Sequence, residues 1–144
     1  MAISWWLVGL FGLSGLACLA AAFHGSRLRS ADAGRGLRWL LTLSGVWGFL
    51  QAGVLVAGEE STAVALYVLA LTVGFATPFA WLYFTSAYAG RDYHRRPAYR
   101  LAALATYVAV VALKLTNPIH GGYFATSFRT DPVRRLVIDE GVLY

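Results

Sequence analysis

Four long runs of apolar residues limit what this chain can fold into. The runs cover residues 4–23, 37–57, 62–89 and 98–116. At about 1.5 Å of rise per helical residue, each run can cross a hydrocarbon core roughly 30 Å thick. A soluble domain of 144 residues could not bury so much apolar surface. The sequence therefore predicts an all-α integral membrane protein with four transmembrane helices in one domain, residues 1–144.

The composition agrees with a lipid environment. Hydrophobic residues make up 58% of the chain and charged residues only 13%, whereas soluble domains have about 25% charged residues. A formal net charge of +5 could indicate nucleic-acid binding. However, the arginines are clustered in short segments between the apolar runs, as in cytoplasmic loops. We therefore expect the lipid bilayer, and no nucleic acid, as a partner.

The charged segments also predict the orientation. Segments 24–38 and 90–100 each hold four arginines and one aspartate, while the turn 58–61 holds two glutamates and no positive charge. The positive-inside rule places the two arginine-rich segments in the cytoplasm. No lysine or arginine precedes the first run, so it is a retained helix and not a signal peptide. We predict a multi-pass cell-membrane protein with its N-terminus outside and an extracytoplasmic loop, 117–144, containing one or two short strands.

Small residues recur on one face of the second run. Ser44, Gly48 and Ala52 are spaced four residues apart, which lets another helix approach closely. Gln51 is the strongly polar residue of this run and is expected to hydrogen-bond to a neighbouring helix. We predict that these four residues mediate helix packing.

Two further polar or helix-breaking residues lie within the third and fourth runs. Pro78, close to Trp81, interrupts the third run; a proline removes one helical hydrogen bond, so we predict a kink there. Lys114 lies one turn from the outer end of the fourth run. We expect its side chain to extend along the helix so that its ammonium group reaches the lipid headgroups.

No catalytic motif is present in the sequence. It has no P-loop, dinucleotide-binding glycine pattern, nucleophile elbow or zinc-binding helix motif. The predicted topology places His24 and His94 at cytoplasmic helix ends and His120 outside, so the three cannot share a metal. We interpret the first two as interfacial polar residues, and the single cysteine, Cys18, as a small apolar side chain. We predict no enzymatic activity, cofactor or metal.

Two motifs point to a known family. The sequence Thr-Asn-Pro-Ile-His, residues 116–120, closes the fourth run, and Pro78 and Trp81 lie in the third. Together with the outside N-terminus and the arginine-rich loops, these motifs resemble the N-terminal seven-helix sensory region of histidine kinases, of the haloarchaeal and bacterial type. The resemblance implies that the chain supplies the first four of seven helices and is truncated before the cytoplasmic kinase or another output domain. It also implies a homodimer.

This resemblance implies a signal-input domain. Residues Asn117, Pro118, His120 and Tyr123 would bind a ligand or shape the outer loop, and a change there would bias the kinase. A simpler explanation is that Asn117 caps the fourth helix and His120 packs the loop. The histidine that this family phosphorylates lies outside the chain, so none of the three histidines inherits that role.

Two other classes of function stay open. A transport or channel subunit usually carries ionisable groups in mid-membrane, but the runs contain Gln51 and no buried carboxylate or arginine. A structural or assembly protein would use its small-residue faces to bind a partner. The same input domain could also control a cyclic-dinucleotide synthase, and the sequence does not identify the small-molecule or physical stimulus.

Overall fold

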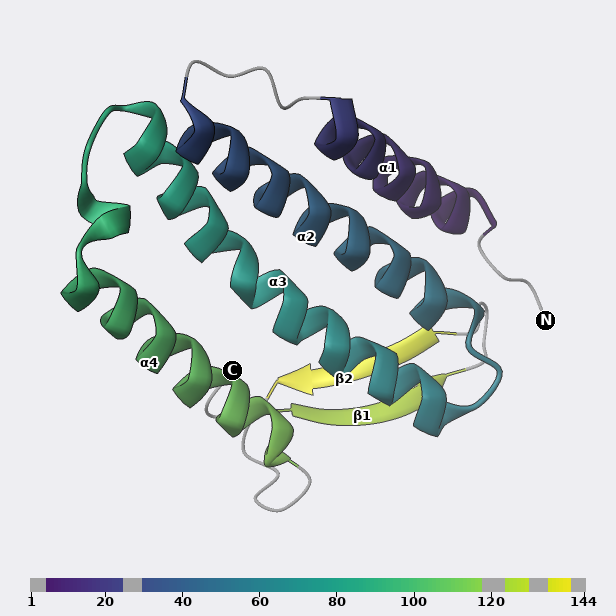
Figure 1. Cartoon of the computed structure of the whole chain (residues 1–144). Coiled ribbons are helices and arrows are strands. Elements are labelled where there is room, and N and C mark those ends of the chain that lie inside the picture. Colours follow the sequence, from purple (N-terminus) through teal and green to yellow (C-terminus); the bar gives the residue numbers. More distant parts are fainter. Residues whose placement is uncertain (1–4, 25–29, 118–123, 130–134, 141–144) are drawn as a thin grey trace.

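The computed structural model describes residues 5–24, 30–117, 124–129 and 135–140, with side chains described up to residue 117. Four long helices lie side by side in chain order, with alternating directions (Figure 1). They are α1 (Trp5–His24), α2 (Ala31–Val56), α3 (Glu60–Tyr88) and α4 (Pro97–Leu115). A short 3-10 helix, η1 (Tyr93–Arg95), connects α3 and α4, and two strands follow, β1 (Phe124–Arg129) and β2 (Arg135–Glu140).

All four helices are long and apolar enough to cross a membrane. This confirms the prediction of a helical membrane protein with four spans. The two strands pair antiparallel, with Phe124 opposite Glu140 and Arg129 opposite Arg135. They lie in the segment where short strands were predicted.

The second helix begins earlier than its apolar run. It starts at Ala31 and not near Leu37, because Ser30 acts as its N-cap and its hydroxyl oxygen accepts a hydrogen bond from the Ala33 N–H at 3.1 Å. Hydropathy identifies the part of a helix that lies in lipid, whereas capping determines where the helix begins. As a result Asp32 lies in the first turn of α2, and the prediction of a loop over residues 24–38 is wrong for residues 31–38.

Helices α1, α2 and α3 are packed closely through glycines. A methyl group added at Gly45 of α2 would lie 2.9 Å from Leu19 Cγ and 3.0 Å from the Gly15 carbonyl oxygen of α1. One added at Gly36 would lie only 2.8 Å from Phe84 Cα of α3. Backbone atoms cannot move aside as side chains can, so these contacts require a residue without a side chain.

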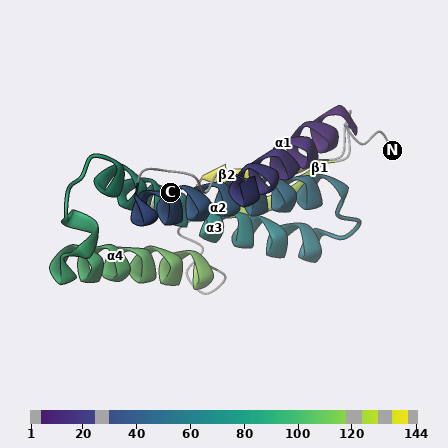
Figure 2. The same ribbon diagram turned by 45° about the horizontal axis from the view of Figure 1, so that its top comes forward.

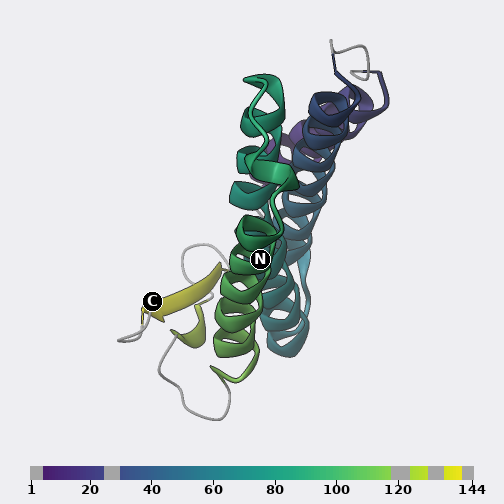
Figure 3. The ribbon, with the colours of Figure 1, turned by 60° about the vertical axis from the view of Figure 1, so that its left-hand side comes forward.

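Helix α4 stands apart from the other three. Figures 2 and 3 show it displaced from the layer that α1 to α3 form, while the connection through η1 keeps it beside α3. Its contacts with α3 are therefore confined to particular side chains, described below.

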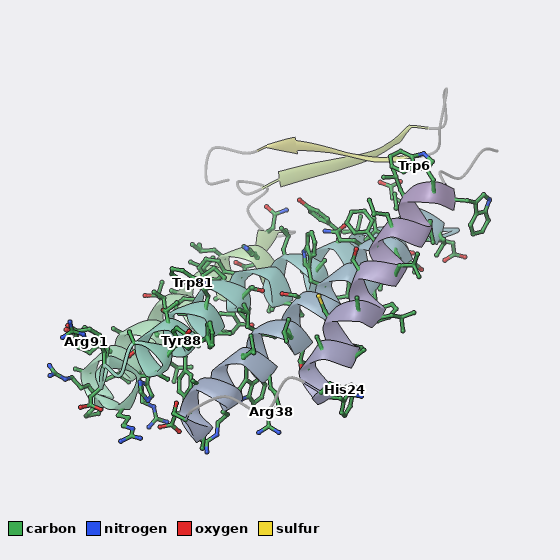
Figure 4. The ribbon with its side chains drawn as sticks, turned by 90° about the horizontal axis from the view of Figure 1, so that it is seen from above. Trp6, His24, Arg38, Trp81, Tyr88 and Arg91 are labelled. Carbon is green, nitrogen blue, oxygen red and sulfur yellow. The ribbon has the colours of Figure 1, made fainter. Side chains whose placement is uncertain are left out.

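The helices present large apolar side chains to their surroundings. Phe23 is 84% exposed and Trp6 71%, whereas the most buried apolar residues include Ala63 and Ala70. Such a surface is stable in lipid and not in water. Trp6 lies toward one end of the helices, and His24, Arg38 and Arg91 lie toward the other (Figure 4). We call the latter the arginine end and the former the hairpin end.

Candidate functional site

A buried lysine connects α4 to α3 near the hairpin end. Lys114 is only 5% exposed, its Nζ donates to the Leu71 carbonyl oxygen at 3.4 Å, and Nζ lies 4.8 Å from the ring centroid of Phe75. The prediction that Lys114 extends to the headgroups is therefore wrong. Lys114 follows Tyr107 by two helical turns, so both side chains share the face of α4 that meets α3.

Three aromatic rings continue this contact toward the arginine end. Phe75 and Phe79 of α3 meet edge to face at 5.5 Å, and Tyr107 of α4 stacks on Phe75 at 6.1 Å. The Tyr107 hydroxyl also donates to the Thr72 carbonyl oxygen at 3.4 Å. Each aromatic pair contributes about 0.5 to 1.5 kcal/mol beyond simple burial, so the α3–α4 contact depends on a few directional interactions.

Part of the predicted outer site can be located. Asn117, just beyond α4, is 6% exposed and therefore buried. Pro118, His120 and Tyr123 lie outside the described residues. Their role in ligand binding or loop shape stays a prediction.

A second polar cluster joins α2 to the α3–α4 connection at the arginine end. Asp32 Oδ2 accepts hydrogen bonds from Arg95 at 2.7 Å (Nη2) and 3.1 Å (Nε), and it lies 3.3 Å from His94 Nε2. Asp32 Oδ1 accepts from Arg35 Nη1 at 3.3 Å. The hydrogen bond and negative charge of Asp32 raise the pKa of Arg95 above its usual value.

His94 links this cluster to the end of α3. Its side chain is 5% exposed, its Nδ1 lies 3.1 Å from Ser86 Oγ, and its backbone N–H donates to the same oxygen at 3.2 Å. The ring also meets Tyr83 edge to face at 4.9 Å. Asp32, Ser86, His94 and Arg95 together form what we call the Asp32 network.

The order of serine, histidine and aspartate in this network resembles a nucleophilic triad. The Ser86 hydroxyl is shared, however, because its oxygen lies 3.1 Å from the Arg91 carbonyl oxygen as well as 3.1 Å from His94 Nδ1. Asp32 is likewise shared with Arg95. Within the described residues, no group of three or more histidine, cysteine or acidic side chains could hold a metal ion.

Comparison with known proteins identifies the family. A protein-family model described as the N-terminal 7TM region of histidine kinase matches residues 7–144. The chain belongs to this family. Compared with curated proteins and with solved structures, it shows no significant match.

Membership of the histidine kinase 7TM family confirms the resemblance seen in the motifs. The four helices are consistent with part of a seven-helix bundle, and the family supports a sensor-type membrane domain. Such a region is not itself the catalytic domain.

The structure also places the residues predicted to shape and pack the helices. Helix α3 runs continuously through Pro78, and Trp81 is 53% exposed. Gly48 is buried against the Phe11 carbonyl oxygen of α1, and Ser44 lines a hollow between α1, α2 and α3. Gln51 and Ala52 are half-buried.

The Asp32 network was missed in the sequence. Asp32 is the single acid among the four arginines of residues 24–38, and the His94 side chain, interpreted as an interfacial polar group, is 5% exposed and packed within this network. One signal was available: each arginine-rich segment has a single acidic residue, and both segments were predicted on the same side. A pairing between the two loops was therefore a reasonable expectation.

Proposed function

We propose that this chain is the signal-input domain of a histidine kinase in the cell membrane, with its N-terminus outside. The signal would pass from the hairpin end to the arginine end through α3 and α4. This route is supported by the two polar clusters that lie at the two ends of these helices. Lys114 joins α4 to α3 at one end, and the Asp32 network joins their connection to α2 at the other.

The positions of these clusters support a coupled movement. An ionisable side chain buried in a membrane domain is unfavourable unless it is paired, and such residues commonly serve function. Movement of α4 along α3 would change the contact of Lys114 with Phe75 and also displace η1, which carries His94 and Arg95. Two alternative positions of α4 would then be coupled energetically to a stimulus outside and to kinase activity inside.

The experiment measures autophosphorylation of the intact kinase reconstituted in vesicles. Lys114→Met and Asp32→Ala should each change the basal rate by roughly fivefold or more, the lower range of allosteric coupling. Because both act on one helix pair, the effect of the double variant should differ from the product of the single effects. Lys114→Arg, which retains the cation, is the matched control.

Unchanged autophosphorylation in both single variants, with the protein folded, would rule out this route of transmission. Independent, multiplicative effects would show that the two clusters do not belong to one moving unit. A homodimer is part of the proposal, since it would bring two kinase domains together. Crosslinking of the intact protein in membranes tests that part separately.

The outer turn is proposed as the place where the stimulus acts. Asn117 is buried next to the last turn of α4, so a ligand bound by Asn117 and His120 would act directly on the helix that carries Lys114. His120→Ala in the intact kinase should abolish the response to the stimulus and leave basal activity in place. A folded variant with a normal response would exclude His120 as a ligand-binding residue.

A further inference from the structure

A cavity lies between α3 and α4 at the arginine end. Its volume is about 710 Å³, within the range of about 300 to 1,000 Å³ that is typical of ligand sites. The wall toward the membrane interior is apolar, with Phe79 and Leu82 from α3 and Ala102 and Ala103 from α4. The aromatic contact of Tyr107 with α3 lies farther along the helices, away from the arginine end.

The rim of the cavity is basic and aromatic. Arg91 and Arg100 line it, both are exposed, and neither forms an ion pair with an acidic side chain in the part of the chain that the structure describes. Tyr93 and Tyr99, which also line the rim, meet edge to face at 5.5 Å. In contrast, Arg95 is already bound to Asp32. Two uncommitted guanidinium groups thus lie at the mouth of an apolar cavity.

We propose that this cavity binds an anionic phospholipid of the adjoining leaflet. The phosphate would lie between Arg91 and Arg100, since guanidinium groups match phosphate oxygens in charge and geometry. An acyl chain would lie along Phe79 and Leu82. Basic pockets between transmembrane helices are a recurrent binding site for acidic lipid headgroups, and a free phosphate ion would leave the apolar wall unused.

A lipid bound here would contact the Asp32 network directly. Ser86 and His94 line the cavity and also belong to the network that holds η1 against α2. Binding would therefore brace α4 and η1 in one position. The inference goes beyond the proposed sensing of an outer stimulus, because lipid binding does not depend on that stimulus.

The test uses the intact protein in nanodiscs of phosphatidylcholine containing phosphatidylglycerol, with the retained lipids measured by native mass spectrometry. Arg91→Gln and Arg100→Gln should each weaken retention of phosphatidylglycerol by about fivefold, and the double variant by roughly thirtyfold. Arg38→Gln is the control, because it removes the same charge at the same end (Figure 4) but outside the cavity. It should leave retention unchanged.

A second pair of variants fills the cavity without changing any charge. Ala103→Phe places a ring in the cavity and should abolish retention of phosphatidylglycerol, whereas Ala105→Phe on the exposed surface of α4 should not. An equal loss in Arg38→Gln would overturn the proposal in favour of general charge attraction. The proposal would also be overturned if phosphatidylglycerol were retained by both Ala103→Phe and the double arginine variant. It would equally be overturned if the wild-type protein retained no lipid because a later helix fills the cavity.

Discussion

The contacts of α3 with its two neighbours are of different kinds. On the α2 side, helices meet backbone to backbone at Gly36, and α2 meets α1 in the same way at Gly45. On the α4 side, contact depends on a lysine, three aromatic rings and a loop network, with a cavity of about 710 Å³ at the arginine end. The first kind permits one spacing between helices, since closely packed atoms cannot interpenetrate.

The second kind of contact permits more than one arrangement. An aromatic pair has several favourable geometries, whereas two backbones in contact have one. In the proposed function, α1 to α3 are therefore the scaffold and α4 is the element that moves. Four variants test the contrast, in order of decreasing effect.

Gly36→Leu should have the largest effect because it places a side chain where even a methyl group would be 2.8 Å from Phe84 Cα. We expect the free energy of unfolding to fall by more than about 3 kcal/mol, beyond ordinary overpacking. Thermal unfolding in detergent, followed by size-exclusion chromatography, measures the loss. Gly12→Leu is the control, since nothing lies within 4 Å of a Cβ there. Similar stability of the two variants would contradict close packing of α2 on α3.

Lys114→Glu should have the next largest effect. It brings a negative charge against the Leu71 carbonyl oxygen and the face of the Phe75 ring, at a cost of roughly 3 kcal/mol. Lys114→Met retains the apolar part of the side chain and should be far less destabilising. The same detergent unfolding assay compares them. If the glutamate were tolerated as well as the methionine, Lys114 would have to lie at the headgroups.

Ser86→Ala should cost about 1 to 2 kcal/mol, because the His94 N–H loses its acceptor in a partly buried position. The control is Ser14→Ala, since the exposed Ser14 hydroxyl donates to the Leu10 carbonyl oxygen of its own helix. That change should be within about 0.5 kcal/mol of wild type. Equal losses in the two variants would mean that Ser86 does not support η1.

Asp32→Asn should change global stability least, because exposed ion pairs contribute little. Its effect is local: hydrogen exchange should become faster in η1, residues 93–95, once Arg95 and His94 lose the carboxylate. Exchange in α1 should stay as it is. Mass spectrometry of deuterated peptides measures both regions, and faster exchange throughout α1 and α2 would show that the network also holds the scaffold.

The sequence alone determined the membrane fold and the family. A bilayer requires apolar runs of a minimum length, so four such runs predict four spans whatever the details of packing. The arginine-rich loops and the Thr-Asn-Pro-Ile-His motif indicated the histidine kinase region that the family comparison confirms. The outer site at Pro118 and His120 was also predicted from this motif, and it lies outside the described residues.

Only the tertiary structure decided where the polar side chains point. Lys114 was expected at the headgroups and is buried against α3, and Asp32 and His94 meet although 62 residues separate them. A polar group in an apolar environment must find a partner, but the identity of that partner depends on how each helix is rotated and how far it lies from the next. The rotation of a helix and its distance from the next helix are not determined by a short stretch of sequence. The length of a span can therefore be predicted from the sequence, whereas its polar contacts depend on the assembled helices.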